Sequence, residues 1–280
     1  MTDANDWRER IGRARALVES RLDEKLTLEQ LAATAHFSEF HFHRLFRAAV
    51  GETDAAHARR LRLERAASRL VGGDDEIVRV ALDAGFESHE GFTRAFKARF
   101  GVAPSVFREE RRSVIAERAK EVMAMELRIE RREPCRIAFV RHEGPYGEVG
   151  TAWATLMKWG WTKMMFGKPD TFGLCFDDPD VTPAERLRYE ACMVVDAKAK
   201  VKGEVRSKDL AGGTYAVGVH EGSFETIGET YAGLCAQVAS EAISGKQWTL
   251  GDPPSMEVYL TDPRKTEPED LRTEVWMPVA

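Results

Sequence analysis

Apolar residues recur every three or four positions through the first part of the chain, which is the spacing of one buried face of an α-helix. The first such run predicts an amphipathic helix and comprises Trp7, Ile11, Val18 and Leu22. A shorter helix is predicted after Thr27, because its hydroxyl can cap a helix and Gln30 stands at the capping-box position three residues on. A third helix follows the capping residue Ser38 and ends at Gly51. Two short helices joined by a tight turn predict a helix-turn-helix unit.

This helix-turn-helix pattern occurs twice. Ala35 and Phe37 return as Ala84 and Phe86, and six further residues return at an offset of 50. These six are Ser38, Phe42, Arg44, Phe46, Ala48 and Gly51, which match Ser88, Phe92, Arg94, Phe96, Ala98 and Gly101. Between the copies, residues 55–71 carry a broad apolar stripe with arginines elsewhere, and so predict a connecting helix. A rigid connecting helix would fix the distance between the two units.

The second half of the chain has a different period. Short alternating segments with glycine turns predict β-strands, and they form an internal repeat. The segment from Ala138 to Tyr146 aligns at an offset of 78 with the segment from Ala216 to Phe224, and each copy predicts a strand, a glycine turn, a helix and two more strands. These further strands are predicted at residues 171–176, 189–195, 256–260 and 272–277. Two β-α-β-β units imply a pseudo-twofold antiparallel sheet with helices on one face.

A chain of 280 residues with two such patterns is expected to hold two domains. The predicted architecture is an all-α double helix-turn-helix domain followed by an α+β domain of two pseudo-symmetric β-α-β-β repeats. The expected boundaries are residues 1–112 for the helical domain, 113–124 for a charged helical linker and 125–280 for the α+β domain.

The charge of the chain is unevenly distributed. The net charge is -5, and residues 1–112 hold 20 basic against 19 acidic side chains, so the second half is the acidic one. A basic surface for DNA would therefore be local to particular helix faces. No apolar run approaches the ~20 residues that span a bilayer and the start lacks a secretory signal, so we expect a cytoplasmic protein with no membrane partner. The 4 cysteines are scattered without a Cys-x-x-Cys pair, and we expect no metal and no cofactor.

The second helix-turn-helix copy carries the most specific motif of the chain. It runs Ile77-x-x-Val80-Ala81-x-x-x-Gly85-Phe86-x-Ser88, continues with Phe92-x-Arg94-x-Phe96-Lys97-x-x-Phe100-Gly101 and ends with Pro104-x-x-Phe107-Arg108. This motif resembles the signature of the DNA-binding domain of the AraC/XylS family. The resemblance covers about 100 residues. It implies two recognition helices held about one DNA turn apart, roughly 34 Å, so that a monomer enters two successive major grooves.

By position, the resemblance implies DNA contacts from the exposed faces of both recognition helices. The predicted DNA-binding residues are Phe40, His43, Arg44 and Arg47 in the first copy and His89, Glu90, Thr93, Arg94 and Lys97 in the second. Arginine can bond bidentately to guanine, Thr and Phe can touch a thymine methyl group, and Glu can accept from cytosine. The alternative is that these residues form solvated polar faces with no role in DNA binding.

Three features depart from the pattern of the AraC/XylS family. His36 stands where the second copy has Gly85, and a positive φ at this turn suits glycine better. Asp54 and His57 stand where family members usually carry Pro and Tyr. Gly91 lies within a recognition helix at a cost of ~1 kcal/mol relative to alanine.

Two strands of the second repeat each pair a carboxylate with an aromatic residue. Alternation groups Glu257 with Tyr259, and Glu274 with Trp276. We expect these residues to face away from the helices and to form a cleft that binds an amphipathic or cationic organic molecule through charge and cation–π contact. Six further residues complete the predicted cleft: Tyr146, Trp153, Tyr189, Glu190, Phe224 and Tyr231. The alternative is an ordinary solvated sheet face.

Several short segments of this half carry a second resemblance. They include His142-Glu143-Gly144-Pro145-Tyr146, Arg188-Tyr189-Glu190-Ala191-Cys192, His220-Glu221-Gly222-Ser223-Phe224 and Thr273-Glu274-Val275-Trp276-Met277-Pro278. In their order and spacing they resemble the GyrI-like small-molecule-binding domain over nearly its whole length. The resemblance implies that the ligand lies between the two repeats and that a strand glutamate contacts it. Glu274 is the favoured glutamate, with Glu190 and Glu257 as secondary choices. The segment 159–166 is predicted either as a lid or as core.

A DNA-binding half followed by a sensing half resembles the Rob-like regulators of the AraC family. We therefore expect a sequence-specific DNA-binding transcription regulator, not an enzyme, that is modulated by an aromatic or cationic small molecule. Its partners would be double-stranded DNA, RNA polymerase and that effector. The alternative is a GyrI-like hydrolase of reactive small molecules, with Glu274 and Tyr189 as acid and base. A third hypothesis is a protein-binding module joined to a constitutive DNA-binding half.

Overall fold

The structure is a computed structural model that describes residues 3–73, 75–121, 126–164, 169–240, 242–243, 246–252 and 254–280. Its contacts divide the chain into two compact units. Unit 1 comprises Met1–Ala67 and Asp75–Pro104, and unit 2 comprises Ser68–Asp74 and Ser105–Ala280. The boundaries expected from the sequence stay predictions, and residues 122–124 of the predicted linker lie outside the described residues.

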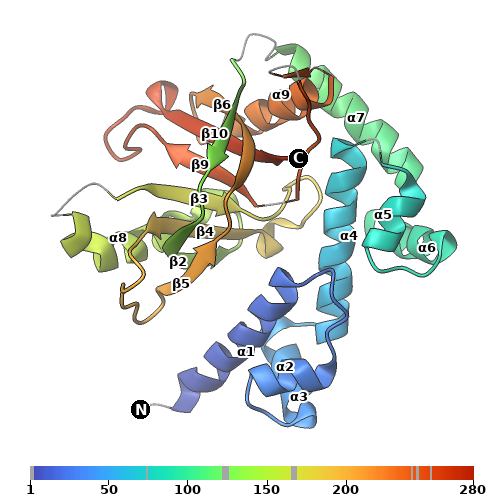
Figure 1. The fold of residues 1–280 in the computed structure, drawn as a ribbon, viewed down its shortest axis with the longest axis vertical. Helices are drawn as coiled ribbons and strands as arrows, with labels where there is room; N and C mark the ends of the chain where they lie inside the picture. The colour runs from blue at the N-terminus through green and yellow to red at the C-terminus, as the bar shows by residue number, and fades with distance from the viewer. Residues whose placement is uncertain are drawn as a thin grey trace. The chain divides into compact units, whose positions relative to one another are not determined.

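Unit 1 is helical and is drawn in blue to blue-green in Figure 1. Its helices are α1 (Asp3–Ser20), α2 (Leu28–Thr34), α3 (Glu39–Val50), the first part of α4 (Asp54–Gly72), α5 (Ile77–Asp83) and α6 (His89–Phe100). Helices α2 and α3 form the first predicted helix-turn-helix unit, and α5 and α6 form the second. The expected connecting helix is α4, so the repeat read from the sequence is confirmed.

The caps of these helices follow the residues that predicted them. The Thr27 hydroxyl accepts from the Gln30 backbone N–H at 3.2 Å, while the Thr27 backbone N–H donates to the Gln30 side chain at 2.9 Å, which completes the capping box. Ser38 and Ser88 cap α3 and α6 with their hydroxyls alone, which accept from the backbone N–H groups of His41 and Gly91. Gly51 ends α3 with a left-handed φ of 80°, a conformation that lacks a steric penalty only for glycine.

The turn of the first helix-turn-helix unit holds a non-glycine residue in a left-handed conformation. His36 has a φ of 53°, and Gly85 at the equivalent turn has a φ of 77°. Arg10 of α1 donates to the carbonyl of Ala35 at 2.7 Å and also to the carbonyl of His36, and its guanidinium stacks 3.7 Å from the centre of the Phe37 ring. These contacts hold the unfavourable turn in place, since tertiary interactions must offset the cost of a positive φ in a residue with a Cβ.

Buried ionic contacts join α4 to its neighbours in unit 1. His57, which is 0% exposed, bonds Glu52 at 2.9 Å, and Arg60 bonds both Glu52 at 2.9 Å and Glu64 at 2.8 Å. Arg99 of α6 reaches the other oxygen of Glu64 at 2.8 Å. The family departure at His57 is thereby explained, because the imidazole is part of an ionic cluster that ties α4 to α6.

Unit 2 contains an eight-stranded antiparallel sheet, drawn in green to red in Figure 1. Its strands are β1 (Arg128–Arg132), β2 (Cys135–Glu143), β3 (Thr171–Cys175), β4 (Arg188–Val194), β5 (Arg206–Leu210), β6 (Gly213–Glu221), β9 (Ser255–Tyr259) and β10 (Arg272–Val279). The short strands β7 (Ala242–Ile243) and β8 (Lys246–Gln247) form a separate pair. The helices of unit 2 are α7 (Pro104–Glu121), α8 (Gly150–Met164), α9 (Ile227–Ser240) and the end of α4.

The order of the strands shows the predicted pseudo-twofold symmetry. It reads β1-β6-β10-β9-β3-β4-β2-β5, so the two β-α-β-β repeats meet where β9 pairs with β3. Strands β1 and β5 were not predicted. Each precedes one repeat in the chain but pairs with the first strand of the other repeat, which ties the two repeats together.

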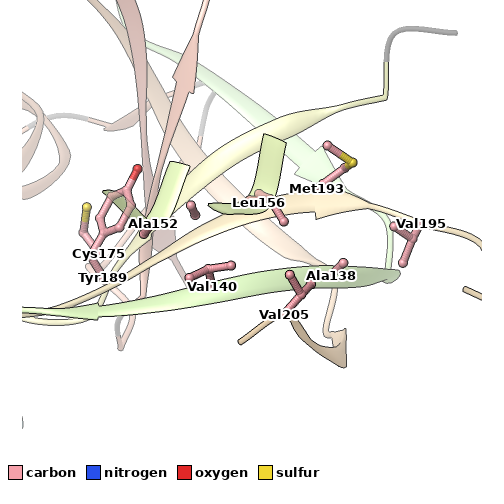
Figure 2. Close-up of a cluster of buried hydrophobic side chains, with 10 residues drawn as sticks. Ala138, Val140, Ala152, Leu156, Cys175, Tyr189, Met193, Val195 and Val205 are labelled. Carbon is pink, nitrogen blue, oxygen red and sulfur yellow. The ribbon is translucent and has the colours of Figure 1, made fainter. Parts of the chain in front are cut away.

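The sheet has a helix-bearing face and a second face that curls on itself. Ala152 and Leu156 of α8 pack with Ala138 and Tyr189 on the helix-bearing face, in a cluster that Figure 2 shows with Tyr189 and Cys175 at one end and Val195 at the other. The second face buries a separate cluster around Phe172. Arg132 of β1 stacks 4.3 Å from the Phe172 ring centre, although four strand pairings separate β1 from β3, so the sheet must curl strongly.

The ionic cluster around α4 predicts an acid-sensitive unit 1. Burial alone raises the pKa of Glu52, but hydrogen bonds and charge from Arg60 and His57 outweigh it and lower the pKa to about 2. A carboxylate whose pKa is lowered by folding stabilises the folded state at pH values above the ordinary carboxyl range. This stabilisation is lost as the pH falls toward 2. We expect Glu52→Gln to cost about 1–3 kcal/mol of unfolding free energy at pH 6, measured with urea, and this difference to shrink below pH 4.5.

Glu87→Gln, at an exposed position in the α5–α6 turn, is the matched control and should differ little from the native chain at either pH. A stability difference for Glu52→Gln that stays constant from pH 6 to pH 3 would contradict this account.

Candidate functional site

The predicted DNA-binding residues of the first unit lie on one helix, α3. Phe42 and Phe46 of that helix are buried, whereas Phe40, His43, Arg44 and Arg47 are all exposed. Phe40 is 72% exposed, and the Arg44 guanidinium lies 5.6 Å from the centre of its ring. An exposed aromatic ring beside an arginine gives this face both an apolar and a cationic contact group.

Helix α6 presents the second predicted set. His89, Glu90, Arg94 and Lys97 are exposed, opposite the buried Phe92 and Phe96. Thr93 differs from the others because it is half-buried, and its hydroxyl has no hydrogen-bond partner among the described residues. A Cβ at Gly91 would lie 3.1 Å from the capping hydroxyl of Ser88, so a side chain at this position would crowd the N-cap.

The three candidate glutamates of the sheet do not share a face. In the pairing of β10 with β9, Glu274 stands opposite Val258, and Glu257 stands opposite Val275. Residues paired across two strands point to the same side, and successive residues alternate, so Glu257 and Glu274 lie on opposite faces. The expected single cleft with both carboxylates is therefore wrong. An acid–base pair of Tyr189 and Glu274 is not assembled either, since Tyr189 lies on the helix-bearing face.

Glu190 and Glu274, on the curled face, are both neutralised by basic side chains. Glu190 is 3% exposed and binds Arg141 at 3.1 Å and Lys208 at 2.6 Å. Glu274 binds Arg128 at 2.6 Å and accepts from the Trp276 indole N–H at 2.9 Å. Both carboxylates therefore form structural ion pairs with basic side chains of the sheet.

Glu257 lies on the helix-bearing face, not on the face away from the helices as predicted. Its partners are hydroxyl groups: Tyr259 donates to it at 2.9 Å, and Tyr231 of α9 donates at 3.3 Å. None of the ion pairs among the described residues involves it. Burial raises the pKa of Glu257 above its ordinary value, and hydrogen bonds from Tyr259, Cys175 and Tyr231 offset only part of that effect. Glu257 as a whole residue is half-buried, and its carboxyl group is recessed.

Aromatic groups from both repeats surround this carboxylate. Trp153 of α8 donates to the Tyr189 hydroxyl at 2.8 Å, and the Tyr189 and Tyr259 hydroxyls lie 2.8 Å apart. Because an indole N–H only donates and a carboxylate only accepts, the donors run in sequence from Trp153 through Tyr189 and Tyr259 to Glu257. Phe224 packs edge-on against Tyr259, with ring centres 5.7 Å apart. The geometry thus brings together the predicted residues Trp153, Tyr189, Phe224, Tyr231, Glu257 and Tyr259, with Tyr146 beside Tyr189 at 6.1 Å.

Three residues of this cluster were missed by the sequence reasoning. Gly173 leaves room for Tyr189, because a Cβ there would lie 2.2 Å from the Tyr189 hydroxyl oxygen. A glycine inside a strand signals such a close approach and could have been noticed. Ser255 lies 3.2 Å from the Tyr231 hydroxyl, and burial raises the pKa of the Cys175 thiol, which stays protonated beside Glu257. No local sequence signal marks either of these two residues.

The segment predicted as a lid or as core is only partly described. Trp159 packs against the cluster around Leu156, and Trp161 is exposed, while Met165 and Phe166 lie outside the described residues. Of the helices that the structure describes, none has the length and apolar character required to cross a membrane. Within the same described ranges, no three His, Cys, Asp or Glu side chains are grouped in a way that would hold a metal ion.

Comparison with known families identifies both halves. Residues 125–280 match the GyrI-like small molecule binding domain, and residues 31–110 match a helix-turn-helix domain. Both resemblances noted in the sequence are thereby confirmed.

Individual relatives match over a limited stretch. The chain is 41% identical over 91 residues to the uncharacterized HTH-type transcriptional regulator YbfP of Bacillus subtilis, covering 32% of this chain and 31% of that protein. It is 36% identical over 91 residues to the right origin-binding protein of Escherichia coli, covering 32% of each. The chain therefore spans about a third of the length of these relatives. Among solved structures, the EcmrR C-terminal domain aligns with a TM-score of 0.44 at 17% identity, covering 56% of this chain and 99% of that one.

Proposed function

This chain belongs to the GyrI-like small molecule binding family and carries an AraC-type helix-turn-helix region, and we propose that it is a transcription regulator whose DNA binding responds to an aromatic cation. The observation that carries the effector class is the recessed Glu257, a carboxylate with hydroxyl partners and no ion pair among the described residues. We include RNA polymerase as a partner, because a regulator of this kind acts on its recruitment or its progress.

The DNA-binding part of the proposal rests on the two recognition helices. Each buries two phenylalanines on its inner side and leaves arginine, lysine, histidine or glutamate on the outer side. Arg44 and Arg94 occupy equivalent positions in the repeat and are both exposed. A guanidinium at that position can read guanine bidentately in the major groove.

The effector part rests on charge. An ionised carboxylate removed from water is costly unless it is paired, and at Glu257 hydrogen bonds from Tyr259, Cys175 and Tyr231 and a favourable charge interaction with His220 offset only part of that cost. A bound cation would supply the missing charge. A primary amine or a guanidinium needs several hydrogen-bond acceptors once it leaves water, and the side chains of Trp153 and Phe224 supply none, because an indole N–H only donates and a phenyl ring has no polar atom. A cation without N–H groups, such as a quaternary ammonium, fits this environment better.

The aromatic part of the effector rests on the rings of Trp153, Tyr259 and Phe224. Trp153 and Phe224 both pack edge-on against Tyr259, with ring centres 5.5 and 5.7 Å away. Phe224 is exposed, so one of its faces is available to a ligand. Aromatic rings around a cation contribute through their quadrupoles, about 0.5–2 kcal/mol for each favourable contact.

The proposed effector site predicts that Glu257 is required for binding the positive charge of a ligand and not for binding its apolar part. Benzyltrimethylammonium and its neutral isostere neopentylbenzene provide a matched pair of ligands. Glu257→Gln should weaken binding of the cation by about 100-fold in calorimetry, since removing one partner of a recessed ion pair is expensive, and should change binding of the isostere little. Glu274→Gln is the matched control, because Glu274 lies on the other face and is paired with Arg128.

The same site predicts a pH dependence. Because the pKa of Glu257 is raised, affinity for the cation should fall as the pH is lowered toward values that are still above the ordinary carboxyl range. Equal affinity of the native protein for the cation and the isostere, or a loss of cation binding in Glu274→Gln instead of Glu257→Gln, would refute the assignment.

The recognition helices predict specific DNA binding that depends on paired arginines. In a fluorescence anisotropy titration at fixed salt, with the DNA just upstream of the gene, Arg44→Ala/Arg94→Ala should lose at least 10-fold of specific affinity. Binding to unrelated DNA should change less. A native protein that does not distinguish the two DNAs would contradict the regulator proposal and favour the protein-binding alternative.

A further inference from the structure

Helix α7 caps the end of α4. Arg108 donates to the carbonyl of Leu70 at 3.1 Å, and Arg112 donates to the carbonyl of Val71 at 3.2 Å and to that of Gly73. The last carbonyls of a helix have no partner within it, so these guanidiniums fix where α4 ends. The end of α4 and α7 also belong to the same compact unit as the sheet.

Arg111, the residue between these two capping positions, has different partners. Its guanidinium bonds Asp180 at 2.8 Å and lies 3.7 Å from Asp178, both in the loop between β3 and β4. Arg111 is 20% exposed, and the two aspartates are about twice as exposed. An ion pair with this much solvent contact contributes little net stability, so small structural changes can make or break it.

The loop that holds these aspartates is anchored in the Glu257 cluster. The Tyr146 hydroxyl donates to the carbonyl of Asp177 at 2.7 Å and accepts from its backbone N–H at 3.1 Å. The Asp177 carboxylate clamps Arg188 with contacts of 2.6 and 2.8 Å. Tyr146 in turn packs against Tyr189, the residue next in line to Tyr259 in the donor chain that ends at Glu257.

We propose that the pair formed by Arg111 with Asp178 and Asp180 is an intramolecular latch through which occupancy at Glu257 reaches the end of α4. The inference rests on the proposed effector site for its input. A cation at Glu257 competes with the hydroxyls of Tyr259 and Tyr231 for the carboxylate, and any shift of Tyr189 is passed to Tyr146 and the loop. Helix α4 continues without a break into unit 1, where Glu64 binds Arg99 of the recognition helix α6.

Loss of the latch should change the coupling between effector binding and DNA binding, whereas loss of a passive surface ion pair should not. Coupling between two ligands requires that one of them alter the balance between two arrangements of the protein, and its size is the ratio of DNA affinities with and without the effector. Removing the latch should lower that ratio while leaving both separate affinities nearly unchanged. Arg111 and its capping neighbours lie just before residues 113–124, the segment predicted from the sequence as a helical linker.

A first experiment needs no ligand. Hydrogen exchange of the full chain should show faster exchange in Arg111→Ala at Val181 and Thr182, whose amides bond the Asp178 carbonyl, and at Gly73, whose amide bonds Arg69. The charge swap Arg111→Asp/Asp180→Arg should restore slow exchange at both places. Arg264→Ala, which removes an arginine paired with Asp262 two residues away, is the control. Unchanged exchange at Gly73 in Arg111→Ala would overturn the latch.

A second experiment measures the coupling itself. The ratio of DNA dissociation constants with and without saturating benzyltrimethylammonium is expected to be about 5-fold or more in the native protein and to fall below about 2-fold in Arg111→Ala. The charge swap should recover the native ratio. A native ratio that persists in Arg111→Ala overturns the latch even though the effector site stands. If the cation does not bind the native protein at all, the proposed function fails, and the hydrogen-exchange result alone decides the latch.

Discussion

A single carboxylate, that of Glu257, which forms no ion pair with any described residue, organises the second half of this protein. Burial raises the pKa of Glu257, and among the described residues its carboxylate accepts hydrogen bonds from the hydroxyls of Tyr259 and Tyr231 and from the thiol of Cys175, with no ion pair. The direction of the hydrogen bonds from Trp153 through Tyr189 and Tyr259 follows from this carboxylate, since each hydroxyl must direct its proton along the chain toward it. The room for Tyr189 depends on Gly173. Burial of the ionised Glu257 carboxylate costs free energy in the empty site, and the same negative charge favours binding of a cation.

The fold explains why this cluster stands where it does. The two repeats meet at the pairing of β3 with β9, so Gly173 and Glu257 are neighbours across the line between them. Helix α8 of one repeat contributes Trp153, and helix α9 of the other contributes Tyr231. The exchange of the edge strands β1 and β5 binds each repeat to the other, which lets two weakly similar halves share one site. The other two glutamates serve the curled face, where Arg128, Arg141 and Lys208 neutralise them.

The sequence predicted elements and repeats better than it predicted the site. Capping residues such as Thr27 and Ser38 act through contacts only a few positions away, so local pattern was enough to place the helices. The repeat at an offset of 78 likewise revealed both β-α-β-β units. Edge strands β1 and β5 escaped because they are highly charged and lack the apolar alternation that marks half-buried strands. The family resemblance favoured Glu274. Alternation along each strand led to the expectation that Glu257 and Glu274 share a cleft, because alternation cannot show the register between two strands, and only that register separates their faces.

The charge state of Glu257 is tested most directly by carbon-13 NMR of labelled glutamate carboxyls, with Glu257→Gln used to assign the resonance. In the free protein, Glu257 should titrate above its ordinary value because burial disfavours its charged form. Saturating benzyltrimethylammonium should move that titration to lower pH, because a bound cation stabilises the carboxylate. A Glu257 resonance that titrates at an ordinary pKa and does not respond to the cation would contradict the account.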